Sequence, residues 1–396
     1  MESARIVGAL ARVTGDFALA EDLAQEALAE ALVSWSVDGV PAQPTGWLLT
    51  VGRRRAIDAF RRRSARDEKY ALLARDLSQE LPGADALFDP DAIDDDVLAL
   101  MFVACHPVLT REARIALTLR VVGGLTTAEI AAAFLVPVPT IQARITRAKK
   151  TLAAAEVPFA VPSPSEVAER LGSVLQVVYL IFTEASHASS GDEWMRSGLS
   201  DEARRLARVL VRLAPQPEVF GLLALLELTA ARFPARLDAS GAPVLLERQD
   251  RTLWDRSAIR RGRAALARAA TPAGGLGAYG LQASIAECHA VAPSVAETDW
   301  PRIVALYEAL LVLTPSPVVE LGRAVAVAMA SGPAAGLALV DRVELPGAHV
   351  VPAIRGELLS RLGRRDEARV AVREAIGLCT NAVERSTLER ALAELR

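Results

Sequence analysis

Two short basic segments carry most of the chemistry that this sequence could perform. The first, residues 53–63, places six arginines in eleven positions, and the second lies within residues 126–152. The second segment ends in the cations Arg144, Arg147, Lys149 and Lys150. Because the whole chain has a net charge of −3 at pH 7, these cations are local excesses and not part of a generally basic protein. Each DNA phosphate that is neutralised releases counterions, so two such segments favour binding to two separate DNA elements.

The second basic segment has the pattern of a helix-turn-helix. Thr126 and Glu129 have the spacing of a capping box, so a helix is expected to begin there. Residues 136–139 are expected to form the turn, and Pro139 suits the first position of the next helix. In that helix the expected buried stripe consists of Ile141, Ile145 and Leu152, with Ala148 beside it. From the helix before the turn, Ile130, Ala131 and Phe134 are expected to face inward.

The same spacing leaves the polar side chains of the second helix outward. They are Thr140, Gln142, Arg144, Thr146, Arg147, Lys149 and Lys150. Glutamine and arginine near the start of a recognition helix can pair with base edges in the major groove, and later lysines lie near phosphates. We therefore favour DNA binding over the alternative, a solvated basic helix in an ordinary helical bundle.

The first basic segment is built differently. Its side chains Arg54, Asp58, Arg61 and Arg62 share the exposed side of a predicted helix, and Trp47 stands at the start of that helix beside a loop. An aromatic ring next to cations suits single-stranded DNA, because stacking of an unpaired base contributes about 1–3 kcal/mol. The alternative is a buried Trp47 beneath a solvated arginine face. The residues of this segment alone do not separate the two interpretations.

The elements that must position these segments are helices. The chain has 396 residues of which 52% are hydrophobic, its β-branched runs are short, and alanine, leucine, arginine and glutamate dominate, so we predict an all-α protein with several domains. Helices are expected over residues 4–35 and 47–66, with a loop at 36–45. The predicted organisation is a helical domain at 1–70, an acidic linker at 71–95, a helix-turn-helix domain at 96–156, and a C-terminal α-helical extension at 165–396 with tetratricopeptide-type hairpins near 316–380.

Other residue patterns were weighed for metal binding and catalysis. Cys105-His106 and Cys288-His289 are adjacent pairs whose side chains point apart on a helix, so we predict no metal site. Glu184, His187 and Asp192 could form an acid–base cluster, but no nucleophile or phosphate-binding loop accompanies them. We therefore expect no catalytic residues, no cofactor and no enzymatic activity. Residues 249–255 are interpreted as an ion-pair and tryptophan anchor between helices, with a ligand or protein contact as the alternative.

Composition also bears on location. The three cysteines have no close spacing, which suits a reducing compartment, and the first residues lack the order of a signal peptide. The most apolar runs, residues 174–182 and 221–228, are too short to span a bilayer. We expect a soluble, cytoplasmic protein that does not bind membranes.

The order of the motifs resembles a known family. Residues 20–27, then residues 46–58, then the helix-turn-helix are similar to regions 2 and 4 of bacterial extracytoplasmic-function sigma factors of the sigma-70 family. The resemblance covers about residues 4–155, and because the chain begins close to the first motif we expect a short first helix. Residues 179–184, 247–255 and 298–301 resemble the C-terminal tetratricopeptide-like helical extension of one sigma subgroup.

The resemblance implies partners and roles for named residues. Asp22, Gln25 and Glu26 would bind the clamp helices of the β′ subunit of core RNA polymerase, with a further contact to the β flap. The −10 element, partly single-stranded, would be bound by Trp47, Arg54, Asp58, Arg61 and Arg62. The double-stranded −35 element would be bound by Thr127, Thr140, Gln142, Arg144, Arg147 and Lys149. The acidic linker would thread through the polymerase channels.

These observations lead to one main functional hypothesis and two alternatives. The main hypothesis is a sigma factor that binds core RNA polymerase and directs promoter-specific initiation, regulated by its fused extension, which would bind a regulatory protein or ligand. The first alternative is a helix-turn-helix regulator that acts without joining polymerase and uses the extension as a sensor or adaptor. The second is a helical adaptor that never contacts DNA.

Overall fold

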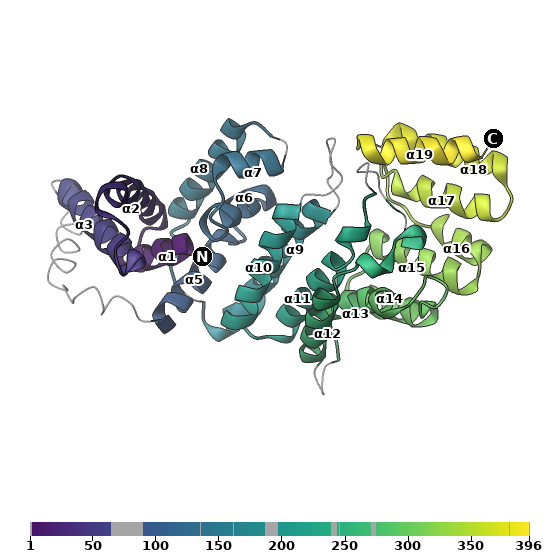
Figure 1. Ribbon diagram of the computed structural model, residues 1–396, viewed down its shortest axis with the longest axis horizontal. Helices are drawn as coiled ribbons and strands as arrows, with labels where there is room; N and C mark the ends of the chain where they lie inside the picture. The colour runs from purple at the N-terminus through teal and green to yellow at the C-terminus, as the bar shows by residue number, and fades with distance from the viewer. Residues whose placement is uncertain are drawn as a thin grey trace. The chain divides into compact units, whose positions relative to one another are not determined.

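The computed structural model describes residues 2–64, 90–134, 136–160, 162–186, 197–238, 244, 246–270, 275–379 and 381–395. Helices dominate these residues and no strand longer than an isolated bridge occurs among them, so the predicted all-α class is confirmed. The chain divides into two compact units, the first reaching to Leu180 and the second beginning at Ile181 (Figure 1).

The first unit opens with three helices that pack on one another: α1 (Glu2–Thr14), α2 (Phe17–Asp38) and α3 (Pro44–Ser64). The prediction of one helix over residues 4–35 was wrong, because the chain turns between α1 and α2. Gly15 has a φ of +63°, a conformation that glycine adopts without steric cost. Asp16 then caps α2, since its carboxylate accepts a hydrogen bond of 3.0 Å from the Leu19 amide.

Among the described residues, α3 is followed by α5 (Pro90–Ala104), α6 (Arg111–Val121), α7 (Thr127–Ala133) and α8 (Val138–Ala154). Helix α5 begins inside the predicted acidic linker, and the rest of that linker lies outside the described residues. Leu100 and Met101 on α5 and Leu117 and Leu119 on α6 are fully buried. This apolar layer supports the helix-turn-helix formed by α7 and α8.

Helix α9 (Pro164–Ser186) begins in the first unit and ends in the second. Its Ser173 hydroxyl donates a hydrogen bond of 2.8 Å to the carbonyl of Cys105, at the end of α5. Arg114 on α6 donates a hydrogen bond of 2.6 Å to the same hydroxyl. The start of α9 is therefore bonded to the helices that carry the helix-turn-helix.

In the second unit, α11 (Pro217–Ala230) packs against α10 (Ser197–Leu213), α12 (Arg256–Ala269) and α13 (Ala278–Val291). Three short 3-10 helices, η2 (Phe233–Ala235), η3 (Leu246–Arg248) and η4 (Arg251–Leu253), connect α11 to α12. Glu227 on α11 is 1% exposed and forms ion pairs with Arg208 of α10 and, at 3.0 Å, with Arg261 of α12. Since a buried carboxylate is stable only when paired, these arginines fix α10 and α12 on α11.

The chain ends in six helices that follow one another in space as they do in sequence (Figure 1). They are α14 (Trp300–Leu313), α15 (Pro317–Ser331), α16 (Pro333–Val340), α17 (Val350–Arg361), α18 (Arg365–Leu378) and α19 (Ala382–Glu394). One apolar cluster joins Leu321 and Ala324 of α15, Leu337 of α16, Leu358 of α17 and Ala368 of α18. The region near residues 316–380 is therefore built of successive helices that pack on one another.

Candidate functional site

Helix α3 carries the first basic segment on an exposed face. Arg54, Asp58 and Arg61 are all exposed, as the helical spacing predicted, whereas the side chain of Arg62 lies outside the described residues. Trp47 in the first turn of α3 is half-buried against Trp35 of α2, with ring centroids 5.4 Å apart and an interplanar angle of 61°. The arrangement is intermediate between the two interpretations, because Trp47 packs against Trp35 but is only half-buried.

The arginines of α3 are held by carboxylates of α2. Arg54 donates to Glu30 at 2.8 Å, and Arg55 reaches Glu30 at 2.6 Å and Glu26 at 2.8 Å. The hydrogen bond from Arg55 is the largest cause that keeps the pKa of Glu30 below its usual value. Glu26, one of the predicted polymerase-binding residues, is thus part of an ion-pair network that holds Arg54 and Arg55 of α3 in place. Arg55 was not singled out in the sequence, although its neighbours were.

Exposed apolar side chains gather at the end of α2. Leu32, Val33, Val37 and Val40 are 79%, 71%, 81% and 67% exposed. Clusters of exposed apolar side chains are typical of interaction surfaces. Gly39, Pro41 and Pro44 led to the prediction of a loop over residues 36–45, whereas α2 continues to Asp38.

The helix-turn-helix is formed as predicted. Glu129 donates its amide to the Thr126 hydroxyl at 3.1 Å, and the Thr126 amide donates to the Glu129 carboxylate at 2.7 Å. The backbone hydrogen bond from Thr126 holds the pKa of Glu129 below its usual value. Helix α8 begins at Val138, so Pro139 is its second residue and not its first. The buried residues of α8 are Ile141, Ile145, Ala148 and Leu152, which confirms the predicted stripe.

The predicted −35 residues lie on the accessible part of the helix-turn-helix. Gln142 and Arg147 are exposed, and Thr127, Thr140 and Arg144 are half-buried. Arg147 is exposed and donates from Nε to the Ala143 carbonyl at 3.3 Å. Gln142 lies in the first turns of α8, where a recognition helix contacts base edges.

Unlike its neighbours on α8, Lys149 forms ion pairs with another helix of the first unit. Its ammonium forms an ion pair with Glu21 and another, of 3.2 Å, with Asp22, both on α2. Arg120 on α6 lies 3.4 Å from the second carboxylate oxygen of Glu21, which is 5% exposed. We call Glu21, Asp22, Arg120 and Lys149 the Glu21 cluster. It joins a predicted polymerase-binding residue, Asp22, to a predicted DNA-binding residue, Lys149, and its central member was missed in the sequence.

Gln25, the remaining predicted polymerase-binding residue, is half-buried on α2 one turn beyond Glu21. The structure therefore brings Asp22, Gln25 and Glu26 onto one helix, with Asp22 and Glu26 exposed. It brings Trp47, Arg54, Asp58 and Arg61 onto another helix, α3, that packs against the first.

The residues weighed for metal binding or catalysis fall into different surroundings. Cys105 is fully buried and its sulfur lies 3.3 Å from the Thr118 hydroxyl; burial raises the pKa of this thiol to about 11. Cys288 is also buried and unpaired. His187, Asp192 and the side chain of Glu184 lie outside the described residues, so the possible acid–base cluster is untested.

Residues 249–255 make internal contacts in the second unit. Trp254 is 2% exposed, and the guanidinium of Arg251 lies 4.5 Å from the centre of its indole. Arg251 also donates hydrogen bonds of 2.8 Å and 2.6 Å to the carbonyls of His289 and Ala292 at the end of α13. The tryptophan anchor is therefore confirmed, but Arg251 reaches backbone oxygens and an aromatic ring where an ion pair was expected.

In the part of the chain that the structure describes, no helix has both the length and the apolar character needed to cross a bilayer.

Comparison with known proteins follows the same division of the chain. The family described as Sigma-70 region 2 matches residues 2–66, and Sigma-70, region 4 matches residues 99–152. A family of unknown function, DUF6596, matches residues 170–270. An uncharacterized protein of Rhizobium meliloti (strain 1021) is 44% identical over 397 residues, which cover 98% of this chain and 93% of the relative. The ECF RNA polymerase sigma factor SigK of Mycobacterium ulcerans (strain Agy99) is 31% identical over 152 residues, or 37% of this chain and 78% of that protein.

Proposed function

Since the chain belongs to the sigma-70 family of RNA polymerase sigma factors, we propose that it binds core RNA polymerase and directs it to specific promoters. The observation that carries the proposal is the presence, on one chain, of two basic helices whose segments match regions 2 and 4. Two modest DNA-binding modules gain affinity when they are held together, because binding of one presents the other at high local concentration. We assign the protein to the extracytoplasmic-function group and to the cytoplasm, and its action is binding, not catalysis.

For polymerase binding we propose the face of α2 that carries Asp22, Gln25 and Glu26. The exposed carboxylates of Asp22 and Glu26 support this assignment, since charged rim residues steer the encounter of two proteins. The exposed apolar residues at the end of α2 extend the same surface. The β′ clamp would receive this face, and the β flap would receive the domain of residues 96–156.

For the −10 element we propose Trp47, Arg54, Asp58, Arg61 and Arg62 on α3, within a domain of residues 1–70. The ring pair of Trp35 and Trp47 lies on the same two helices as the ion-paired Arg54 and Arg55. A half-buried indole beside ordered cations could offer stacking for an unpaired base and charge for the adjacent phosphate.

For the −35 element we propose Thr127, Thr140, Gln142, Arg144, Arg147 and Lys149. The exposed Gln142 and Arg147 are suited to base edges, and Thr127 at the start of α7 is suited to a phosphate. Lys149 would exchange its present carboxylate partners on α2 for a DNA phosphate. Formation of the complex thus includes the opening of the Glu21 cluster.

For residues 165–396 we propose a tetratricopeptide-like regulatory extension that binds a protein segment or a ligand. Successive helices from α14 to α19 pack on their neighbours in sequence, which is typical of solenoid folds. Gly322 and Gly356 are 34 positions apart (356 − 322), the tetratricopeptide period. A Cβ atom at position 322 would lie 2.7 Å from the side chain of Tyr307 on α14. A Cβ atom at position 356 would lie 2.7 Å from the side chain of Val372 on α18.

Run-off transcription with purified core polymerase tests the proposal, with a promoter library as template. We expect transcripts from a small set of promoters only when the protein is added. The double variant Arg144→Ala/Arg147→Ala should reduce these transcripts and lower the slope of log K against log salt by about 2. Arg256→Ala/Arg260→Ala removes two exposed arginines of α12 and serves as the matched control. The absence of any promoter-dependent transcript across the library contradicts the proposal.

The alternative, a helix-turn-helix regulator that never joins polymerase, is separated by the triple variant Asp22→Ala/Gln25→Ala/Glu26→Ala. A sigma factor should lose its co-elution with core polymerase when this face of α2 is removed. An independent regulator should keep both its DNA binding and its effect on transcription. The second alternative, a helical adaptor that never contacts DNA, is tested by neutralising Arg144 and Arg147. The activity of such an adaptor would not change in this variant.

A further inference from the structure

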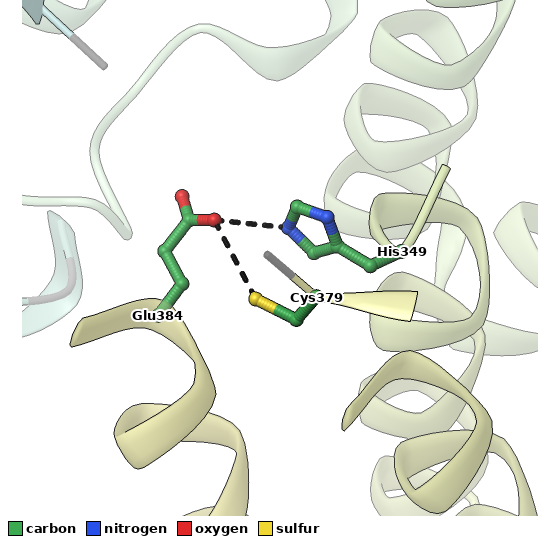
Figure 2. A group of neighbouring side chains, drawn as sticks. All are labelled: His349, Cys379 and Glu384. Carbon is green, nitrogen blue, oxygen red and sulfur yellow. Dashed lines mark hydrogen bonds and ion pairs between the residues drawn. The ribbon is translucent and has the colours of Figure 1, made fainter. Parts of the chain in front are cut away.

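Three side chains with metal-ligating atoms converge at the last three helices of the chain. His349 is the residue before α17, Cys379 directly follows α18, and Glu384 lies in the first turn of α19. Figure 2 shows the Glu384 carboxylate directed at both the imidazole of His349 and the thiol of Cys379. Within the described part of the chain, this is the group of histidine, cysteine and acidic residues whose ligand atoms all lie within 4.8 Å of one another.

The distances between the ligand atoms fit a tetrahedral ion. His349 Nε2 lies 3.1 Å from Glu384 Oε2, and Cys379 Sγ lies 3.9 Å from the same oxygen. Zinc bonds of about 2.3 Å to sulfur and about 2.0–2.1 Å to nitrogen or oxygen separate neighbouring ligands by about 3.3–3.6 Å. Small rotations of the Glu384 and Cys379 side chains are therefore sufficient to place three ligands around one ion.

We propose that His349, Cys379 and Glu384 form a binding site for Zn²⁺ or a similar divalent transition metal. A set of one sulfur, one nitrogen and one oxygen donor selects such borderline ions, whereas Mg²⁺ and Ca²⁺ require oxygen ligands throughout. Three protein ligands leave a fourth position for water or for a ligand from outside the chain.

The surroundings of Cys379 define the protonation change on binding. Without a metal, the Cys379 thiol donates a hydrogen bond of 3.4 Å to the Asn381 carbonyl. Burial raises the pKa of this thiol. Binding replaces this S–H bond by a metal–sulfur bond and releases one proton to solvent, with no change of oxidation state. The imidazole and the carboxylate are 25% and 30% exposed, so an ion can enter from the surface.

The packing of α19 gives the site a structural consequence. None of the residues of α19 is buried, in contrast to those of α17 and α18. Polar contacts hold the start of α19 instead, namely the Asn381 cap and a hydrogen bond of 2.5 Å from Arg385 to the Cys379 carbonyl. A metal bound by Glu384 of α19 and by ligands beside α17 and α18 would fasten the last helix to the hairpin before it.

Metal uptake by the full-length protein tests the proposal. The protein is stripped with a chelator, exposed to Zn²⁺, separated from free metal, and its zinc content is measured. We expect one ion per chain, and a zinc affinity reduced by at least about tenfold in His349→Ala, Cys379→Ser and Glu384→Gln. Cys288→Ser is the matched control, because Cys288 is also buried but lies outside the group. Equal zinc affinity of the wild type and Cys379→Ser overturns the proposal, as does no uptake by the wild type.

Two further readouts keep the test valid if a variant fails to fold, because each gives a result for the wild-type protein by itself. Co²⁺ should produce a thiolate-to-metal charge-transfer band, which Cys379→Ser lacks and Cys288→Ser retains. Zn²⁺, but not Mg²⁺, should slow amide hydrogen exchange over residues 382–394. A protein in which His349 and Glu384 form only an ion pair would show neither effect.

Discussion

At the scale of single residues, the most unusual surroundings are those of His289 on α13. Its ring packs edge-on against Trp300 at 5.2 Å, and its carbonyl accepts the hydrogen bond from Arg251. Burial, together with the positive charges of Arg232 and Arg251, lowers the pKa of His289 to about 4. The folded protein therefore holds a neutral imidazole where the unfolded chain would take up a proton below pH 6.5.

The pKa of His289 predicts a loss of stability in acid. Above pH 6.5 the imidazole is neutral in both states, and as the pH falls towards 4 only the unfolded state is protonated. We expect the free energy of unfolding to fall by about 3 kcal/mol over this range. Denaturant unfolding of the full-length chain at several pH values measures it. His289→Phe keeps an aromatic ring and should flatten this part of the profile; an unchanged profile contradicts the assignment.

At the scale of elements, the Glu21 cluster links α2 to α6 and α8 through ion pairs. Glu21 is almost fully buried and pairs with both Arg120 and Lys149. Opening of the cluster should therefore destabilise Glu21 more than the other members. Exposed ion pairs contribute little, but a desolvated carboxylate depends on its cations. The contact holds the proposed polymerase-binding helix against the proposed recognition helix.

Removal of Lys149 should favour polymerase binding in the absence of DNA. Lys149→Ala deletes the only side chain of α8 that the structure pairs with α2, among the ion pairs described. We expect core polymerase to bind this variant about threefold to tenfold more tightly, corresponding to about 1 kcal/mol for a partly exposed pair. Fluorescence anisotropy with labelled protein measures the affinity. Lys150→Ala changes the exposed neighbouring lysine and should have no effect; equal or weaker binding of Lys149→Ala would show that the cluster does not compete with polymerase.

The elements that the sequence predicted well are those specified by near neighbours. The helix-turn-helix depends on Thr126, Glu129 and the two prolines of the turn, all within fourteen positions. The break at Gly15-Asp16 is equally local and was missed because the apolar periodicity on either side was followed across it. The buried stripe of α8 and the exposed face of α3 follow from helical periodicity.

The contacts that the sequence could not predict join distant positions. Glu21 meets Lys149 across 128 positions, and the spacing of either residue gives no sign of the other. The same holds for His349, Cys379 and Glu384, which lie at the start of α17, just after α18 and in α19, and match no metal-binding spacing. Such groups depend on how helices pack, and burial of Glu21 among cations is a tertiary property. The roles of the proposed DNA- and polymerase-binding residues remain predictions.

At the scale of the whole molecule, the two units share one helix. The first part of α9 is bonded to α5 and α6 through Ser173, and its end belongs to the second unit, where Phe182 stacks on Phe233 at 5.8 Å. The regulatory extension proposed for residues 165–396 therefore has a covalent, helical connection to the layer beneath the helix-turn-helix.

This connection predicts that the position of a truncation matters. A chain ending after residue 161 lacks Ser173 and leaves Arg114 and the Cys105 carbonyl without their partner, whereas a chain ending after Ser186 keeps both bonds. Two side-chain hydrogen bonds contribute about 2 kcal/mol together, so the longer chain should have a Tm higher by several degrees. Calorimetry of the two chains measures the difference. Equal Tm values would mean that α9 contributes nothing to the first unit, and transcription by the longer chain reports the effect of the extension itself.

The internal partners of Lys149 also alter how the proposed promoter complex would respond to electrolyte. A lysine that leaves water for a phosphate expels small ions from the DNA, and this expulsion is what makes protein–DNA affinity fall as salt rises. Lys149 comes instead from two carboxylates of its own chain. The carboxylates that Lys149 leaves must then bind cations from solution or basic groups of polymerase. This uptake of cations offsets the cations that the DNA phosphate releases. If Lys149 binds a promoter phosphate as proposed, promoter binding at this position would exchange one set of anions for another around a single ammonium group, and it would be less sensitive to ionic strength than the number of cations on α8 suggests.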